Sequence, residues 1–248
     1  MTALATLLSH ALVVYMVAIW PVLGRARYRS LQKKLRDEDA GARTRVYRRM
    51  ILHQWTIVMA VMVIMVLGSI PPATLGLRKP DEAWLEATTL LVLLAAIGAS
   101  ALFFRWKADG MVKRLLKMAG AILPVTARER WLFVAISIGA GISEEMLFRG
   151  FLLYYLDQHF PGLDSGAQIL MSGLVFGWAH LFQGWRGMAL TGMLGAAFAL
   201  LYIATGSLLS PIVIHAAIDL RILLIVTPER MRALGLANGI EDSARIAP

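Results

Sequence analysis

Residues 130–155 read RWLFVAISIGAGISEEMLFRGFLLYY, an apolar run long enough to cross a membrane that nevertheless contains Glu144, Glu145 and Arg149. A membrane-spanning helix needs about 20 predominantly apolar residues. A charged side chain at membrane depth costs roughly 3 kcal/mol on insertion scales, so such residues are functional candidates by default. The stretch therefore predicts a membrane helix that carries part of a working site.

The composition of the whole chain indicates the same class. Hydrophobic residues make up 58% of it and the mean hydropathy is +0.65, which favours a polytopic membrane protein over a soluble domain. Cysteine is absent, which excludes disulfides, thiolate metal sites and cysteine nucleophiles. We predict an all-α, polytopic transmembrane helix bundle of about seven spans. The candidate spans are 3–23, 50–70, 84–104, 130–155, 166–183, 187–206 and 210–227.

The charge of the connecting segments predicts the orientation. Lys and Arg are concentrated in 24–49 and 105–130, whereas the segment between them, 71–83, is nearly neutral. The positive-inside rule then makes both basic loops cytoplasmic, with the N-terminus outside and the C-terminal tail inside. The net charge of +9 is explained by this topology and by contact with anionic lipids, so no nucleic-acid partner is expected. The compact length suggests a bacterial inner membrane.

The chain divides into three parts by composition. Residues 1–110 carry apolar spans and basic linkers, and are expected to be a membrane scaffold. Residues 111–228 hold the intramembrane ionisable groups and are expected to be the catalytic helix bundle, followed by a cytoplasmic tail, 229–248. Small residues that allow close helix approach are also concentrated in the second part. They are Gly139, Gly141, Gly150, Gly173, Gly177, Gly192 and Gly195.

The two adjacent glutamates are expected to have different roles. Glu145 and Arg149 are four residues apart on a helix and can form an ion pair. Glu144 points about 100° away from Glu145 and is left unpaired, which suits a general base acting on water. The alternative is a buried ion pair that only fixes helix packing.

Two histidines occur in equally apolar surroundings. His180 lies one turn after Phe176, and His215 lies one turn before Asp219, whose carboxylate could fix the imidazole tautomer. Glu144, His180 and His215 could hold a zinc ion with an open position, or a glutamate and a histidine could activate water without a metal. A lone membrane histidine is more often a packing residue. His10, His53 and His159 lack such partners and are read as interfacial or core residues.

In this order, the motifs resemble the CAAX-protease and bacteriocin-processing (CPBP) family of intramembrane endopeptidases, also called the Abi family. The family pattern is Glu-Glu-x-x-x-Arg, then Phe-x-x-x-His, then His-x-x-x-Asn/Asp. This sequence fills it with Glu144-Glu145-x-x-x-Arg149, Phe176-x-x-x-His180 and His215-x-x-x-Asp219. The resemblance covers roughly residues 130–225, and residues 1–110 carry no recognised motif.

The resemblance implies a role for each matched residue. Glu144 would activate water and His180 would orient or polarise that water, or ligate a metal. His215 and Asp219 would complete the site, with Glu145 and Arg149 in support. Asp219 stands where many relatives carry Asn, and an ionised Asp cannot donate to an oxyanion, so we expect it to orient His215 instead.

The predicted function is therefore that of an intramembrane, glutamate-dependent endopeptidase, with or without zinc. Its substrate would be a membrane-associated peptide or lipidated protein, and CAAX-type processing and bacteriocin immunity are both open. The alternatives are a non-catalytic scaffold or immunity protein of the same fold, and a proton-coupled transporter. A linear count puts His180 toward the inner leaflet and His215 toward the outer half, so convergence of the two with Glu144 is the decisive geometric test.

Overall fold

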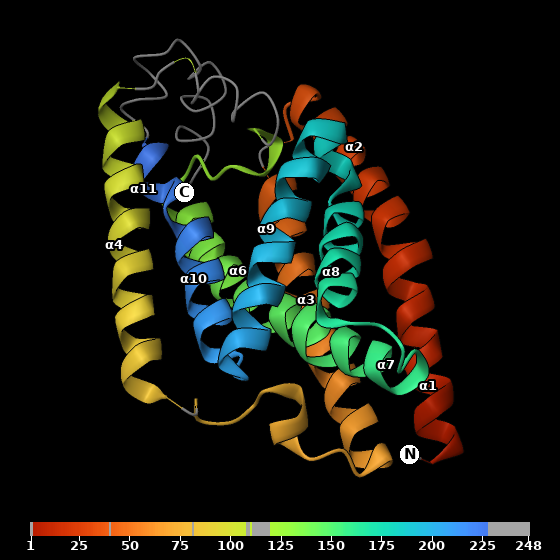
Figure 1. Cartoon of the computed structure of the whole chain (residues 1–248). Coiled ribbons are helices and arrows are strands. Elements are labelled where there is room, and N and C mark those ends of the chain that lie inside the picture. The colour runs from red at the N-terminus through yellow and green to blue at the C-terminus, as the bar shows by residue number, and fades with distance from the viewer. Residues whose placement is uncertain (1, 40, 81, 108–109, 111–119, 228–248) are drawn as a thin grey trace.

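The computed structural model describes residues 2–39, 41–80, 82–107, 110 and 120–227. Within these ranges the secondary structure is helical and contains no strand, which confirms the predicted all-α fold (Figure 1). The predicted cytoplasmic tail, 229–248, lies outside the described residues.

The N-terminal part consists of three long helical segments. The first runs unbroken through α1 (Ala3–Val14), the π-helical turn η1 (Tyr15–Ile19) and α2 (Trp20–Arg36). It is followed by α3 (Ala42–Gly68) and, after the short 3₁₀ helix η2 (Pro72–Leu75), by α4 (Ala83–Lys107).

The prediction that residues 24–49 form a loop is wrong. Nearly all of it is helical, because α2 continues to Arg36 and α3 begins at Ala42. Lys and Arg are good helix formers, so an apolar span can extend into a basic, exposed continuation without a break.

The C-terminal part begins with the 3₁₀ turn η3 (Gly120–Ile122) and α6 (Ala127–Glu145). Thr126 and Glu129 form a reciprocal capping box at the start of α6. Helix α6 continues without interruption through further helical segments, and shorter helices complete the chain. These are the π-helical η4 (Met146–Phe151), α7 (Leu152–His159), α8 (Ser165–Ala179), η5 (Leu181–Gln183), α9 (Gly184–Thr205), α10 (Leu209–Leu220) and α11 (Ile222–Ile225).

By length and composition, five of the described helical segments could cross a membrane. They are Ala3–Arg36, Ala42–Gly68, Glu86–Arg105, Ala127–His159 and Leu181–Thr205. The two other predicted spans, 166–183 and 210–227, correspond to α8 with 15 residues and α10 with 12 residues. Both are too short to span alone. The prediction of a multi-pass membrane protein is therefore confirmed. Of the roughly seven predicted spans, two are shorter helices, α8 and α10.

Glycine contacts hold the motif-bearing helices together, as predicted. A Cβ atom on Gly177 would lie 2.6 Å from the Met188 carbonyl oxygen, and one on Gly173 would lie 2.8 Å from the Gly192 carbonyl oxygen. These contacts join α8 to α9. A Cβ atom on Gly141 of α6 would similarly lie 2.8 Å from the carbonyl oxygen of Ile212 in α10.

The expectation that residues 111–228 hold every intramembrane ionisable group is wrong. Glu86 lies in the first turn of α4 and only 3% of it is exposed. Its Oε1 accepts hydrogen bonds from the Ser210 backbone N–H at 3.1 Å and from the Ser210 hydroxyl at 2.5 Å. The carboxylate thus binds the first turn of α10, which explains how it is tolerated in an apolar helix.

The described residues of both basic segments lie at one end of the bundle. Figure 1 shows the end of α2, the start of α3, the end of α4 and the end of α8 together at the top, opposite the N-terminus. This arrangement agrees with two loops on one side of a membrane.

Candidate active site

The first motif lies where the helix changes geometry. Helix α6 ends at Glu145 and the chain continues as the π-helical turn η4, all of whose residues are buried. A π-turn adds a residue to one helical turn and is frequent at functional sites. Across this turn Arg149 Nη1 donates to Glu145 Oε1 at 2.8 Å, and both side chains are fully buried. The predicted ion pair is confirmed.

Arg149 also joins the motif to the neighbouring helices. Its Nη2 donates to the Gly195 carbonyl oxygen of α9 at 2.9 Å. Its guanidinium carbon lies 4.4 Å from the centre of the Phe176 ring of α8. The buried charge is therefore met by a carboxylate, a carbonyl and an aromatic face.

Glu145 orients His215. The Nδ1 atom of His215 lies 2.7 Å from Glu145 Oε1, and the ring stacks on Phe198 with centroids 5.3 Å apart. A carboxylate already paired with Arg149 only accepts hydrogen bonds, so Nδ1 carries the proton. The prediction that Asp219 fixes the tautomer is wrong, because Asp219 Oδ2 lies 4.0 Å away and faces the other nitrogen, Nε2.

Two carboxylates face the Nε2 atom of His215. Glu144 Oε2 lies 3.9 Å from it, and Asp219 Oδ2 lies 4.0 Å from it. Glu144 Oε2 is buried and has no hydrogen-bond partner among the described residues. The glutamate expected to be unpaired thus has a carboxylate oxygen that no protein group occupies.

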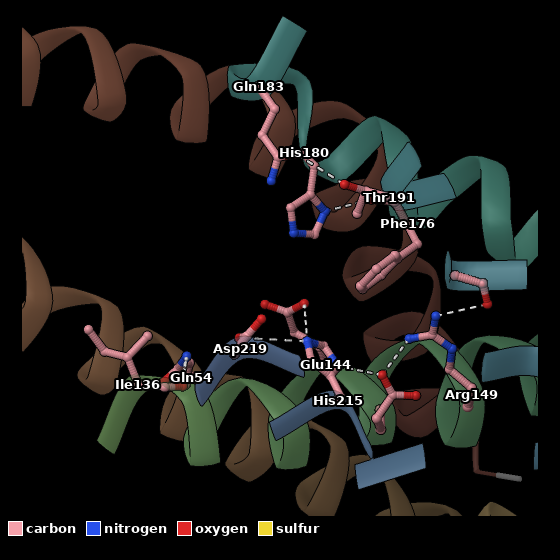
Figure 2. Close-up of polar contacts among 12 residues, drawn as sticks. Gln54, Ile136, Glu144, Arg149, Phe176, His180, Gln183, Thr191, His215 and Asp219 are labelled. Carbon is pink, nitrogen blue, oxygen red and sulfur yellow. Dashed lines mark hydrogen bonds and ion pairs between the residues drawn. The ribbon is translucent and has the colours of Figure 1, made fainter. Parts of the chain in front are cut away.

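His180 lies at the end of α8, facing this cluster. Its Nδ1 atom is 2.8 Å from the Phe176 carbonyl oxygen, which can only accept, so Nδ1 carries the proton in a neutral ring. Its Nε2 atom is then a free acceptor. Figure 2 shows the ring directed into the space above Glu144 and Asp219.

The predicted site residues therefore converge. The Phe176 ring centre lies 4.8 Å from that of His180 and 6.0 Å from that of His215, so both imidazoles surround one phenyl ring. The shortened α8 explains why the linear count was misleading, since His180 caps a helix of only 15 residues.

A cavity of about 240 Å³ connects part of the cluster to the outside. Glu144 and His180 line it, whereas Glu145, Arg149 and His215 do not. The side chain of Asp219 is 37% exposed but does not line this cavity. The cluster thus has two layers, with one carboxylate and one imidazole at the cavity and the ion pair and second imidazole behind them.

Sequence reasoning missed residues that the N-terminal part contributes to this cavity. His53 of α3 binds the Tyr15 hydroxyl of η1 at 2.6 Å, and both line the cavity. The sequence predicts an interfacial or core residue at His53, and the structure places it in the cavity wall. Gln54 also lines the cavity and donates to the Ile136 carbonyl oxygen at 3.0 Å. The sequence signal for Gln54 is that its amide lies in an otherwise apolar stretch of α3.

The structure does not test the predicted metal set, Glu144, His180 and His215. Among the described residues, no three His, Asp or Glu side chains gather as a group that could hold a metal ion. The Nδ1 atoms of His180 and His215 have other partners, which leaves their Nε2 atoms as the ones that could bind water or a metal. A zinc ion at this site stays a prediction.

The chain was compared with protein-family models, curated proteins and solved structures. No curated protein and no solved structure matches the chain. Residues 126–221, however, match the family model described as type II CAAX prenyl endopeptidase Rce1-like. This region contains all three motifs and every residue of the cluster. Residues 126–221 of this membrane protein are therefore similar to the Rce1-like family of type II CAAX prenyl endopeptidases, and the resemblance indicated by the motifs is confirmed.

Proposed function

We propose that the protein is a membrane-embedded endopeptidase in which Glu144 is the general base. One observation supports this most directly: Glu144 and His180 line the same cavity, and each offers an acceptor atom that no described protein group occupies. A carboxylate and a neutral imidazole that line one cavity are suited to position a nucleophilic water molecule.

A water molecule between them would be oriented by both. It would donate one hydrogen to the Glu144 carboxylate and the other to His180 Nε2, which leaves a lone pair free to attack a peptide carbonyl. Glu144 takes the proton as the new C–O bond forms. It then transfers that proton to the departing amine as the C–N bond breaks, so the step balances without a metal.

His215 would stabilise the charge that develops on the carbonyl oxygen. Glu145 holds its Nδ1–H, and an imidazolium would direct a second N–H from Nε2 toward Glu144 and Asp219. Such a fixed donor is worth about 3 kcal/mol where negative charge appears only in the transition state.

The proposed substrate is the peptide segment of a membrane-associated or lipidated protein. Residues of α2, α3 and η5 line the cavity, and the end of α2 and the start of α3 lie at the end of the bundle opposite the N-terminus (Figure 1). By the positive-inside rule this end is cytoplasmic, so the substrate would enter from the cytoplasm. CAAX-type processing is the specific activity that the family match favours.

The test is cleavage of farnesylated peptides with a C-terminal CAAX sequence by the full chain in liposomes, followed by mass spectrometry. Glu144→Gln and His180→Ala should each lower the rate by about 10²–10⁴-fold without loss of folded protein. Glu82→Gln and His159→Ala are matched controls. His159 Nδ1 donates to the Tyr155 carbonyl oxygen just as His180 Nδ1 donates to that of Phe176, but His159 does not line the cavity. Undiminished turnover by Glu144→Gln would refute the proposal.

Chelation tests the place of zinc. We expect that 1,10-phenanthroline leaves the cleavage rate unchanged, since the described side chains form no three-donor group. Loss of activity on chelation, restored by added zinc, would instead require a metal bound by Glu144, His180 and His215.

A further inference from the structure

Tyr15 and His53 form a second polar pair in the wall of the cavity. The Tyr15 hydroxyl lies 2.6 Å from His53 Nε2, and both side chains line the cavity that Glu144 and His180 also line. Both residues lie outside 126–221, the region that matches the family model. The water-activation mechanism uses neither side chain, so the pair needs an explanation of its own.

Helix α8 holds the tyrosine of this pair in place. Tyr15 is the first residue of the π-helical turn η1, a geometry that is frequent at functional sites. Trp178 of α8 donates its Nε1–H to the Val17 carbonyl oxygen of the same turn at 2.8 Å. Because Trp178 precedes His180 by two residues, this hydrogen bond ties the turn to the end of the helix that carries the second motif.

Trp20 holds the histidine of the pair in a similar way. Its ring packs edge-on against the His53 imidazole, with ring centres 4.8 Å apart. The same ring lies 5.9 Å from that of Phe148 in the first motif. The imidazole is therefore packed against the motif helix through one aromatic ring, and the pair has a fixed place in the site.

A count of hydrogens shows what the pair can still bind. A tyrosine hydroxyl and a neutral imidazole carry one donor hydrogen each, and the bond between them uses one of the two. The remaining donor is His53 Nδ1–H if the hydroxyl donates to Nε2, and it is the Tyr15 O–H if Nε2 donates to the hydroxyl. Among the described residues, neither side chain forms another hydrogen bond. One donor is thus left in either tautomer.

A substrate peptide in the cavity needs such a donor. Its carbonyl oxygens leave water, and each then requires a hydrogen-bond donor from the protein. The free atoms of Glu144 and His180 are acceptors, which suit water and cannot bind a carbonyl oxygen. The cations that line the cavity, Arg27, Lys34 and Arg49, are exposed and would have to lose hydration to bind one. A neutral donor binds a carbonyl oxygen at a smaller desolvation cost.

We propose that the Tyr15–His53 pair donates a hydrogen bond to one main-chain carbonyl oxygen of the substrate and thereby positions the peptide beside Glu144. The inference rests on the proposed peptidase function. The contact involves the backbone alone, so it favours an extended segment of any sequence over a folded one. The N-terminal part of the chain then takes a direct part in substrate binding.

The test combines changes in the peptide with changes in the pair. A set of fluorescent farnesylated CAAX peptides has one peptide bond at a time replaced by an ester, which weakens the carbonyl oxygen as an acceptor. Binding to full-length Glu144→Gln protein is measured by fluorescence anisotropy. We expect one ester position to weaken binding about fivefold, as loss of a single hydrogen bond does. Adding Tyr15→Phe and His53→Leu together should abolish that effect, because no donor is then left.

The single variants test the count of hydrogens. Tyr15→Phe leaves the imidazole N–H and His53→Leu leaves the hydroxyl, so each retains one donor. We expect each single variant to keep part of the ester effect at the same position. An ester effect that persists undiminished in the double variant at every position would overturn the proposal.

A second tyrosine–histidine pair provides the matched control. The Tyr155 hydroxyl of α7 lies 2.7 Å from His10 Nδ1 of α1, and neither residue lines the cavity. Tyr155→Phe with His10→Leu should lower the unfolding temperature about as much as the test pair does, yet leave the ester effect intact. An equal loss of the ester effect in both double variants would mean that helix packing alone is responsible.

Cleavage by the chain with Glu144 intact keeps the two proposals apart. Coupling between one ester position and the Tyr15–His53 pair, without hydrolysis of any peptide, would contradict the peptidase function alone. Hydrolysis without such coupling at any position would contradict the carbonyl site alone. Failure of the unmodified peptide to bind would contradict both.

Discussion

Glu145 is the residue on which the buried cluster depends. Its Oε1 atom accepts from both Arg149 at 2.8 Å and His215 at 2.7 Å. The spacing of four residues predicted the first contact, because helical geometry fixes it. No spacing predicted the second, since His215 is seventy residues away and reaches Glu145 only through the packing of α10 on α6.

Arg149→Ala should therefore destabilise the protein as well as inactivate it. Removing one partner of a buried ion pair leaves the other charge stranded, at about 3–5 kcal/mol. Thermal unfolding in detergent should show a large drop for Arg149→Ala and little change for Glu144→Gln, whose Oε2 atom accepts no hydrogen bond from a described residue and lies 3.9 Å from His215 Nε2. A normal unfolding temperature for Arg149→Ala would contradict its role in holding the helices.

Asp219 offers a second test at this scale. Its carboxylate shares the space beside His215 Nε2 with that of Glu144. Asp219→Asn keeps a hydrogen-bonding side chain of the same size and removes one negative charge, so we expect activity within about tenfold of the wild type. Asp219→Ala leaves no hydrogen-bonding group beside His215 Nε2 and should lose about 10²-fold or more. Equal losses in the two variants would mean that the charge of Asp219, and not hydrogen bonding, is required.

Among the elements, α10 depends on a contact that crosses the two halves of the chain. Glu86 of α4 binds Ser210 in the first turn of α10, five residues before His215. Glu86→Ala should cost about 1–2 kcal/mol, as loss of a helix cap does, and should lower activity by moving His215. Glu82→Gln, at an exposed position just before α4, is the control. The measurements are thermal unfolding and the cleavage rate; unchanged values for Glu86→Ala would rule out this support.

The contact between α8 and α9 depends on glycine. Gly177→Ala would bring a methyl group within 2.6 Å of a backbone oxygen and should destabilise the protein by about 1–3 kcal/mol. Gly98→Ala in α4 is the matched control, because nothing lies within 4 Å of its Cβ position. It should be neutral or slightly stabilising in a helix interior. Equal unfolding temperatures for the two variants would show that α8 and α9 can separate without cost.

Over the whole molecule, the sequence predicted the helical class and the helices that bear the motifs. Apolar length and four-residue spacing are local properties, so they can be read directly. The short α8 and α10 could not be predicted in this way, since apolar residues continue beyond their ends. The cavity walls formed by α2 and α3 were also missed, because Tyr15 and His53 acquire their contacts only in the folded bundle.

Topology is the prediction that belongs to the whole molecule. The chain contains no cysteine, so Lys33→Cys in the last turn of α2 and Thr74→Cys in η2 each introduce a single thiol. Helix α2 ends at the top of Figure 1, whereas η2 follows α3 at the bottom. In intact cells, an impermeant maleimide should label Thr74→Cys and leave Lys33→Cys unlabelled until the membrane is opened. The reverse pattern would invert the orientation and the side from which substrate enters.

The cavity that joins the two halves also has a consequence for how such a protein can diversify. Its reacting groups come from residues 126–221, whereas most of its walls come from α2 and α3, outside that region. Substitutions in α2 and α3 can therefore change the cavity walls while the motif residues stay the same. Related chains with the same motifs are then expected to accept different substrates. A hybrid that joins residues 1–110 of one relative to the motif region of another should have the substrate selectivity of the relative that supplied residues 1–110.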